Sequence, residues 1–437
     1  MKKYILIILC CLTSFPLWSY NVNMIVEHYS VEQGLPNNTV NCTLKDRDGF
    51  IWFGTWYGLC CFDGVKFKTF NKQEHDSDVP PRKIQRIVED KNGYIWVKTI
   101  DRKLYVFNKV TECFHAVYDD MKNYSENIQV IKLQNTAEGD VLLLTKDKNL
   151  LLAGVDEKGQ VTIKILFDSR NEINKHDYTL KHHVLCETEE YISWIGTDYK
   201  VAAVHKGPEL ASRPADFITS KINSGDKDSF TSFFEDGRKV WVGDRAGIFY
   251  SIDVRTGLVN RYVLSEIKGA ISNLLVTPAG YVYLSVTGQG TYEYDLAERR
   301  LQKINTEMND AMVTHAFIDQ YDKIWFHENE KALIYYDPLN HTAKRFPFTM
   351  FGKITTLYSE DAGERGLFFL SPAGEAWLFD REHAEMVYIN KLKQLSNDRA
   401  NQQFYHLMLD NDGVLWLSSA DEGVYCMNFP KKQFNLL

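Results

Sequence analysis

The adjacent histidines His182 and His183 come nearest to metal chemistry in this chain, because imidazole is the commonest metal ligand in proteins. Cys186 and Glu187 follow them, but a metal site here needs a further ligand from another part of the chain. A satisfied histidine pair at a surface or strand edge is the simpler interpretation. The chain has no G-x-S-x-G, H-E-x-x-H or phosphate-loop motif and no cysteines at zinc spacing. We therefore expect no metal, no cofactor and no catalytic residue.

Carboxylates are plentiful, with 58 acidic residues, and sequence spacing alone identifies no catalytic pair for glycoside hydrolysis among them. Three closely spaced pairs superficially resemble calcium loops, but none belongs to a twelve-residue loop that ends in a bidentate glutamate. Asp, Asn and Gly at such spacing are ordinary hairpin-turn residues. We therefore interpret all three pairs as turns: Asp46/Asp48, Asp90/Asn92 and Asp410/Asp412.

An internal repeat must position these residues. The segment DRDGFIWFGTWYGLCCFDG (46–64) recurs along the chain in units of about 45 residues. Six copies keep a tryptophan in the middle of the second apolar run: Trp52, Trp96, Trp194, Trp241, Trp325 and Trp416. Three further copies place Leu143, Tyr283 and Phe369 in that slot. We count nine units.

Each unit reads as four short alternating strands joined by tight turns, which is the signature of a β-propeller blade. The sequence therefore predicts an all-β fold, a β-propeller of four-stranded antiparallel blades with about nine units. A seven-bladed ring followed by two blades of a second propeller is the alternative. The tryptophans are expected to pack between blades, where each buries about 200 Å². We interpret the cysteines beyond residue 20 as small buried apolar residues.

The two ends of the repeat region resemble fourth strands. The segment IVEHYSVEQGLP (25–36) precedes the first full unit, so we expect it to complete the last blade and to close the ring. The chain also ends on KKQFNLL, a second segment of this kind, which suggests that residues 430–437 begin a following domain and that the chain is a fragment of a longer protein.

The turns between second and third strands vary from unit to unit, and variation on a repeated scaffold is typical of a binding surface. Aromatic planes and polar groups in these turns suit a carbohydrate or another polar polymer, although each residue alone is more simply a solvated turn residue. The candidate ligand-binding residues are Trp56, Tyr57, Arg102, Tyr199, Lys200, Arg245, Gln289 and His327.

The composition argues against nucleic-acid binding, because the formal net charge is -8 and no basic block is longer than a pair. The start MKKYILIILCCLTSFPLWSY is typical of a secretory signal peptide, which we place at residues 1–20, with an uncleaved anchor as the alternative. We therefore expect export to the periplasm and a propeller over residues 21–437. No later stretch is apolar enough to span a bilayer, so membrane association would come only through segments outside this chain.

The stretch 27–70 resembles the opening of the sensor regions of hybrid two-component regulators in Bacteroidetes. GLPNNTV, DRDGFIWFGT and FDGVKF are its most specific elements, and they match the two-component regulator propeller repeat. The resemblance extends more loosely to about residue 430. It implies a periplasmic sensor of glycan fragments, followed in the full-length family by a second propeller and by histidine kinase parts that are not found here.

The resemblance makes a non-enzymatic, ligand-sensing propeller the leading hypothesis, with an oligosaccharide as ligand and a second propeller or a second copy of the chain as protein partner. A secreted polysaccharide-degrading propeller enzyme and a protein-docking scaffold are the alternatives. Propeller folds serve all three functions, so only the residues at the site separate them.

Overall fold

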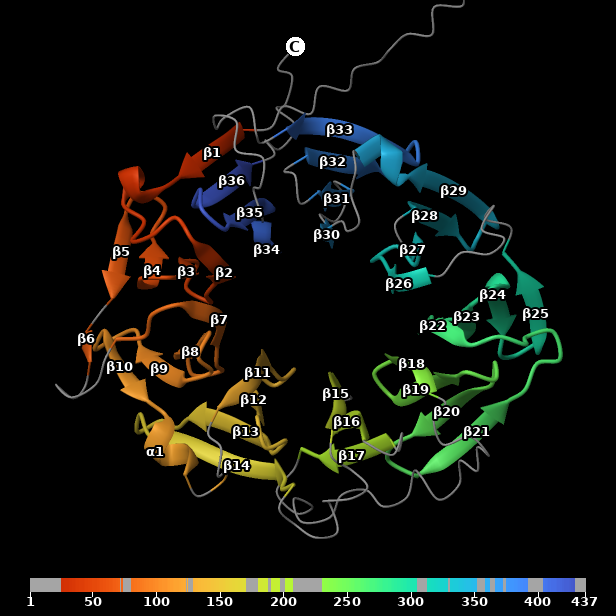
Figure 1. Ribbon diagram of the computed structural model, residues 1–437, viewed down its shortest axis with the longest axis horizontal. Coiled ribbons are helices and arrows are strands. Elements are labelled where there is room, and N and C mark those ends of the chain that lie inside the picture. The colour runs from red at the N-terminus through yellow and green to blue at the C-terminus, as the bar shows by residue number, and fades with distance from the viewer. Residues whose placement is uncertain are drawn as a thin grey trace, which may run out of the picture.

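The computed structural model describes residues 25–70, 72–73, 80–122, 124, 129–169, 180–187, 190–196, 201–206, 230–304, 313–328, 331–351, 358–361, 366–371, 375–391 and 404–428. Within these residues nine β-sheets follow one another around a ring (Figure 1). The repeat of about 45 residues is therefore one blade, and the nine units form one ring rather than a seven-bladed ring with two blades left over.

In each blade the chain runs from the inside of the ring to the outside. The innermost strands are β2 (Val40–Lys45), β7 (Ile84–Glu89), β11 (Val130–Asn135), β15 (Leu180–Glu187), β18 (Phe230–Glu235), β22 (Ile271–Val276), β26 (Val313–Ile318), β30 (Tyr358–Asp361) and β34 (Phe404–Leu409). The second strands are β3 (Ile51–Thr55), β8 (Ile95–Thr99), β12 (Val141–Thr145), β16 (Tyr191–Gly196), β19 (Lys239–Asp244), β23 (Tyr281–Val286), β27 (Ile324–Glu328), β31 (Leu367–Leu370) and β35 (Val414–Ser419).

The outer half of each blade follows the same order. The third strands are β4 (Gly58–Phe62), β9 (Leu104–Asn108), β13 (Leu150–Val155), β17 (Val201–His205), β20 (Phe249–Asp253), β24 (Gly290–Asp295), β28 (Ala332–Asp337), β32 (Glu375–Asp380) and β36 (Val424–Asn428). The outer strands are β5 (Phe67–Phe70), β10 (Cys113–Ala116), β14 (Val161–Phe167), β21 (Leu258–Tyr262), β25 (Arg300–Lys303), β29 (Thr342–Pro347), β33 (Glu385–Lys391) and, in the ninth blade, β1 (Ile25–Tyr29). The fourth blade has three described strands.

Four short elements lie outside this pattern. Strand β6 (Lys72–Gln73) pairs in parallel with β10 at the outer edge of the second blade. The α-helix α1 (Tyr118–Met121) and the 3-10 helices η1 (Val31–Gln33) and η2 (Phe348–Phe351) lie in the segments between blades. No described helix has the length and apolar character needed to cross a membrane.

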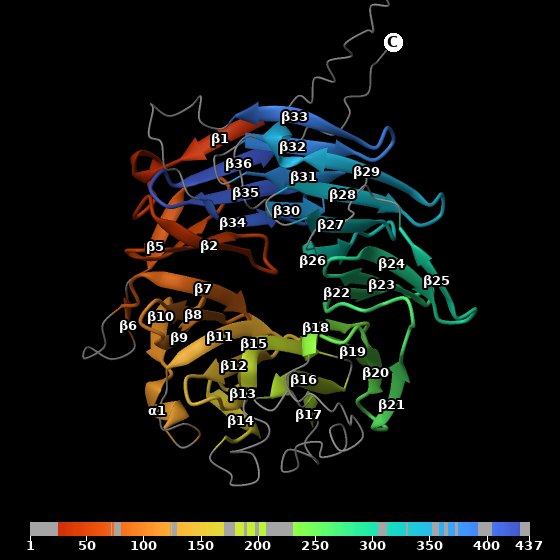
Figure 2. The ribbon, with the colours of Figure 1, turned by 45° about the vertical axis from the view of Figure 1, so that its right-hand side comes forward.

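Strand β1 closes the ring. It pairs antiparallel with β36 in the register Ile25↔Asn428 to Tyr29↔Val424, so the first strand of the chain becomes the outer strand of the last blade. The turned view shows β34, β35, β36 and β1 stacked in this order (Figure 2). The predicted closing segment is thereby confirmed. The predicted signal peptide and residues 430–437 lie outside the described residues.

The tryptophans lie between blades as predicted, and all six are at least 95% buried. Trp52 of the first blade packs edge-on against Phe107 of the second, with ring centroids 5.6 Å apart. Trp325 of the seventh blade contacts Phe379 of the eighth at 4.7 Å. Each indole thus supplies apolar contact that a single four-stranded sheet cannot make by itself.

A turn aspartate holds most of these indoles. Asp46 accepts backbone N–H bonds from Asp48 (3.0 Å) and Phe50 (2.9 Å) with Oδ1, and Oδ2 accepts the Trp52 Nε1–H bond at 2.7 Å. The same Asp–Trp clasp recurs with donor–acceptor distances of 2.7 to 3.3 Å at four further pairs: Asp90–Trp96, Asp236–Trp241, Asp319–Trp325 and Asp410–Trp416. The turn interpretation of Asp46, Asp90 and Asp410 is confirmed, and their bond to the indole was not predicted.

Two blades without a tryptophan also lack the aspartate. Thr136 and Thr277 occupy the turn position in the third and sixth blades, where each hydroxyl accepts a backbone N–H bond. In the sixth blade Tyr283 fills the tryptophan slot and donates to the buried carboxylate of Glu293 at 2.9 Å. Tyr336 of the seventh blade donates to the same carboxylate at 3.2 Å, so a different polar contact joins this pair of blades.

Five cysteines are buried and unpaired, as predicted: Cys42, Cys60, Cys61, Cys113 and Cys426. Neighbours Cys60 and Cys61 lie in different apolar clusters, one facing the ninth blade and one facing the second. Adjacent residues of a strand point to opposite faces of the sheet, which explains the division.

Candidate functional site

The two rims of the ring differ in what forms them. We call hairpin rim the face with the turns between first and second strands and between third and fourth strands. We call link rim the face with the turns between second and third strands and the segments that link each blade to the next. Antiparallel order within each blade produces this division, because the chain reverses direction at each turn.

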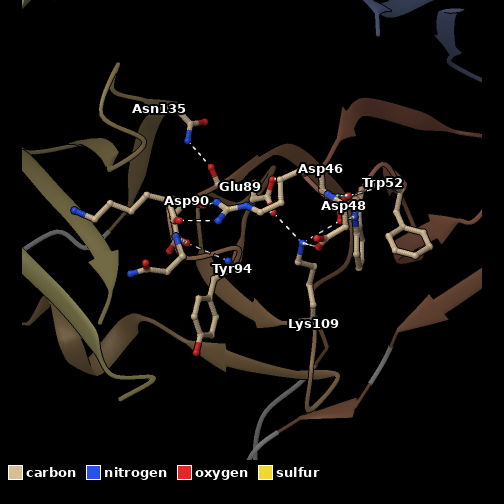
Figure 3. Close-up of polar contacts among 12 residues, drawn as sticks. Asp46, Asp48, Trp52, Glu89, Asp90, Tyr94, Lys109 and Asn135 are labelled. Carbon is tan, nitrogen blue, oxygen red and sulfur yellow. Dashed lines mark hydrogen bonds and ion pairs between the residues drawn. The ribbon is translucent and has the colours of Figure 1, made fainter. Parts of the chain in front are cut away.

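The hairpin rim holds the one group of described carboxylates with metal-binding geometry: Asp46, Asp48 and Glu89. The ammonium of Lys109 lies among them, with Nζ 3.1 Å from Asp46 Oδ2, 2.6 Å from Asp48 Oδ2 and 2.8 Å from Glu89 Oε1 (Figure 3). Burial disfavours the Lys109 ammonium, but the hydrogen bonds that it donates to the three carboxylates outweigh burial and raise its pKa. The cluster is therefore an inter-blade ion pair, in which lysine is the cation.

Equivalent pairs join other blades along the hairpin rim. Lys109, Lys206 and Arg381 each follow directly after a third strand and contact the preceding blade's turn. Lys206 Nζ lies 2.6 Å from Glu138 Oε1, and Arg381 Nη1 lies 2.5 Å from Asp319 Oδ2. These side chains hold the blades together, and so they are not available to a ligand.

Backbone hydrogen bonds join the first three blades on the link rim. Lys83, in the segment between the first two blades, donates its N–H to Trp56 O and accepts from Ile100 N–H, both at 2.9 Å. In the next segment Val130 N–H donates to Arg102 O at 2.9 Å and Gln129 O accepts from Lys146 N–H at 2.8 Å. The variable turns of the first three blades are thus fixed relative to one another.

Trp56 and Tyr57 form the exposed turn of the first blade, with 41% and 64% of their surfaces accessible. The Thr55 hydroxyl shapes this turn, since it donates to Gly58 O at 2.8 Å and accepts from Tyr57 N–H at 3.1 Å. The Lys83 ammonium lies 5.2 Å from the centroid of the Trp56 ring. The two aromatic planes therefore stand beside a cation at the outer surface of the link rim.

Arg102 lies in the corresponding turn of the second blade, 99–103. The Thr99 hydroxyl donates to Asp101 and accepts from Lys103 N–H at 3.1 Å, while Arg102 takes a left-handed backbone conformation with φ of 69°. Burial raises the pKa of the Asp101 carboxyl, but bonds from Thr99 and Lys103 outweigh it and lower that pKa. The turn therefore presents a fixed carboxylate next to an exposed guanidinium.

A pocket of about 400 Å³ opens beside this turn. The residues that line it include the charged groups of the turn, an apolar floor from α1 and β9, and polar or aromatic groups from the link: Asp101, Arg102, Lys103, Leu104, Tyr105, Ala116, Val117, Tyr118, Met121 and Gln129. Val117 and Met121 are fully buried, whereas Tyr118 is 55% exposed. We call this the rim pocket. An aromatic edge, an apolar floor and several hydrogen-bonding groups are what a small polar ligand requires.

The remaining predicted residues lie elsewhere. Tyr199 and Lys200 are outside the described residues. Arg245 is an exposed turn residue of the fifth blade. Gln289 of the sixth blade accepts from Lys268 N–H at 2.7 Å and donates to Glu266 O at 3.2 Å, so its side chain braces a link.

The prediction that His327 lies in a rim turn is wrong. His327 belongs to β27, where its ring is half-buried, 2.9 Å from Thr314 Oγ1 and 5.0 Å from the centroid of Phe348. Burial, together with the nearby His315, lowers the pKa of the imidazole. Among the predicted residues, Trp56, Tyr57 and Arg102 thus share one sector of the link rim.

The side chains that the sequence did not identify come from the link after the second blade. Tyr118, Met121 and Gln129 lie between two repeat units, where no repeated pattern marks a residue as unusual. The side chains of His182 and His183 lie outside the described part of the chain.

The fold and the site define the class of protein, a nine-bladed β-propeller with its variable turns on the link rim. Residues 34–57 match the family model described as the two-component regulator propeller. The first blade therefore carries a repeat of this family, as the resemblance predicted. A curated relative, Histidine kinase P4 of Formosa agariphila, is 32% identical over 87 residues, a match that covers 18% of this chain and 6% of that kinase.

The solved structures that this chain matches have low sequence identity to it. The extracellular domain of a putative hybrid two component system from B. thetaiotaomicron is 14% identical, with a TM-score of 0.41, and the match covers 92% of this chain and 65% of that one. The Dos1 propeller is 13% identical, with a TM-score of 0.46 and coverage of 92% and 94%. The chain thus spans about two thirds of the length of the two-component domain that it resembles.

Proposed function

We propose that this chain is the periplasmic, non-enzymatic ligand-sensing propeller of a two-component regulatory system and that it detects glycan-derived oligosaccharides. The family repeat at residues 34–57 supports the regulatory role. The start of the chain supports export, because it has the charge and apolar pattern of a signal peptide. A second propeller or a second copy of the chain would be the protein partner that carries the signal onward.

The rim pocket is the observation that supports ligand binding most directly. It lies on the rim where the turns vary. The exposed ring of Tyr118 lines it, and the exposed rings of Trp56 and Tyr57 lie in the turn of the neighbouring blade. Sugar rings stack on aromatic planes through their C–H faces, while their hydroxyls need planar donors and acceptors such as Asp101 and Gln129. The backbone bonds of the link rim hold these groups in place before a ligand arrives, which lowers the entropic cost of binding.

Calorimetric titration of the purified protein with oligosaccharides from a panel of polysaccharides tests this function, with product analysis of the same mixtures. We expect binding without cleavage, and a Trp56→Ala/Tyr118→Ala variant should bind at least tenfold more weakly. Phe50→Ala is the matched control, because Phe50 is an exposed aromatic residue on the hairpin rim of the same blade as Trp56. Release of shorter products would identify an enzyme instead, and absence of both binding and cleavage would favour a docking scaffold.

A further inference from the structure

Cations gather on the link-rim side of the second blade, although the chain as a whole has a net charge of -8. Arg86 lies near the start of β7, Lys98 near the end of β8, and Arg102 in the turn that follows β8. Arg102 also lines the rim pocket. We call these three residues the blade-2 cations.

The blade-2 cations are neighbours in space. Arg86 and Lys98 are directly paired residues of adjacent antiparallel strands, which places their Cβ atoms about 5 Å apart. Lys98 Nζ donates to Gln85 Oε1 at 2.9 Å and to Ile131 O of the third blade at 2.5 Å. Arg102 O accepts from the N–H of Val130, the residue before Ile131, so Lys98 and the backbone of Arg102 both contact the start of β11.

Within the part of the chain that the structure describes, none of the blade-2 cations forms an ion pair. The carboxylates of this sector have other partners. Asp101 accepts from Thr99 and pairs with Lys103, and Asp120 Oδ2 lies 2.8 Å from His115 Nε2. On the hairpin rim, by contrast, the single residue Lys109 pairs with three carboxylates. The missing counter-charge is therefore a property of this sector and not of the whole ring.

The absence of a counter-charge is least favourable for Lys98, because its side chain is buried and only 6% exposed. Burial, and then the charge of Arg102, lowers the pKa of its ammonium to about 8. A buried ammonium without an anion is unfavourable, and a fold that needed only packing would place an apolar residue here. Equivalent positions in the other blades include Gly54, Leu144 and Ser285, so the blade architecture does not require a lysine.

Arg86 is accessible to solvent on an innermost strand of the ring. Its side chain is exposed. Its strand, β7, is the innermost strand of the second blade (Figure 1). Arg86 also influences His406 on β34 of the ninth blade, since burial and then the charge of Arg86 lower the pKa of that imidazole to about 4. The exposed Arg86 guanidinium is therefore accessible to an anion.

We propose that the blade-2 cations bind a carboxylate or sulfate group of the ligand, so that the sensed oligosaccharide is an acidic one. The inference rests on the proposed function and specifies its substrate class. Arg102 connects the two parts of the site, because it belongs to the rim pocket and to the cation cluster. An anion bound there would replace the counter-charge that Lys98 lacks, and the two guanidinium groups would supply forked donors that match a planar carboxylate or a sulfate.

Three tetrasaccharides of different charge test this proposal by calorimetric titration: a tetragalacturonate, a sulfated galactose tetrasaccharide without carboxylates, and neutral cellotetraose. We expect at least one acidic probe to bind at least tenfold more tightly than cellotetraose, with an affinity that falls as salt is raised. Arg86→Ala and Lys98→Met should each weaken acidic-probe binding at least fivefold. The melting temperature of Lys98→Met should rise, which separates loss of binding from loss of fold.

Arg255→Ala is the matched control, because Arg255 is an exposed arginine in a hairpin-rim turn of the fifth blade. Equal binding of neutral and acidic probes, or equal loss of affinity in Arg255→Ala and Arg86→Ala, would overturn the acidic-ligand proposal and leave the proposed function standing. Failure of all three probes to bind would contradict both. The two acidic probes show whether carboxylate or sulfate is the preferred group.

Discussion

The two rims of this propeller solve the same problem, the joining of neighbouring blades, with different chemistry. On the hairpin rim, buried aspartates hold indoles, and cations such as Lys109 pair with carboxylates of the adjacent blade. On the link rim, backbone hydrogen bonds of Lys83 and Val130 join the first three blades, and side chains such as Arg102 and Tyr118 are accessible. Side chains that do not join blades are the ones that can contact a ligand.

This contrast leads to opposite expectations for mutations on the two rims. Changes on the hairpin rim should lower the free energy of unfolding, because they remove partners from buried charges. Changes to the link-rim cations should leave that free energy unchanged or raise it, because within the described residues these cations form no ion pair. The predictions below begin with the largest expected effect.

Removal of a hairpin-rim aspartate should have the largest effect. Asp46→Ala breaks two backbone bonds, the Trp52 bond and the Lys109 pair at a residue that is 5% exposed. We expect a loss of about 3–5 kcal/mol in the free energy of unfolding, measured in urea. Asp101→Ala is the link-rim counterpart and should cost less than about 1 kcal/mol, because its partner Lys103 is exposed. Equal losses would contradict the contrast between the rims.

Removal of a hairpin-rim cation should have a slightly smaller effect. Lys109→Met removes the ion-pair partner of Asp46 and Asp48 and leaves Glu89 with Arg47 alone, and we expect a loss of about 2–4 kcal/mol at pH 7. Lys68→Met is the control, because Lys68 forms an exposed pair with Glu112 between the same two blades, and it should cost less than about 1 kcal/mol.

The effect of Lys109→Met should depend on pH in a defined direction. A bond from Lys109 lowers the pKa of Asp48, so the stabilisation is present above the unfolded pKa of about 3.9 and is lost as the pH falls through the folded value. The difference between Lys109→Met and the native chain should therefore shrink when the pH is lowered from 7 to below 4. An unchanged difference would show that Lys109 acts through its aliphatic stem.

Replacement of the buried link-rim lysine should act in the opposite direction. Lys98→Met removes a desolvated ammonium, and we expect a gain of about 1–3 kcal/mol in the free energy of unfolding at pH 7. Both states of the native chain are protonated at Lys98 below its folded pKa of about 8, so the full gain is present there. It should fade between pH 8 and about 10.5, where only the unfolded native chain still binds the proton. Lys146→Met, an exposed change in the next blade, should change stability by less than about 0.5 kcal/mol.

The smallest effect concerns backbone strain at the site. Arg102 and Lys148 occupy equivalent turns of the second and third blades, and both have φ of 69°. Glycine adopts this conformation without a Cβ clash, so Arg102→Gly and Lys148→Gly should each gain about 0.5–1 kcal/mol in thermal unfolding measurements. Only Arg102→Gly should weaken binding of the acidic tetrasaccharides. Equal loss of binding in both variants would place the ligand beyond the second blade.

The architecture could be predicted from the sequence because it repeats. Nine copies of a turn, an apolar run and a central aromatic residue predicted the blades, the inter-blade position of Trp52 and its equivalents, and the closing role of residues 25–36. Repetition makes each copy evidence for the others, even where Leu143 or Tyr283 replaces the tryptophan. The residues of the site could be predicted only in part, since Arg102 lies in a repeated turn and Tyr118 lies in a link.

The sequence by itself determined the strand pattern, the number of units and the rim on which the turns vary, because alternation and turn residues act over a few neighbours in the chain. Only the tertiary structure decided which turns meet. It showed that Lys109 occupies the carboxylate cluster, that Gln289 braces a link, and that His327 belongs to a strand. It also showed Arg86, Lys98 and Arg102 together without a counter-charge, since such proximity depends on register between strands and contact between blades.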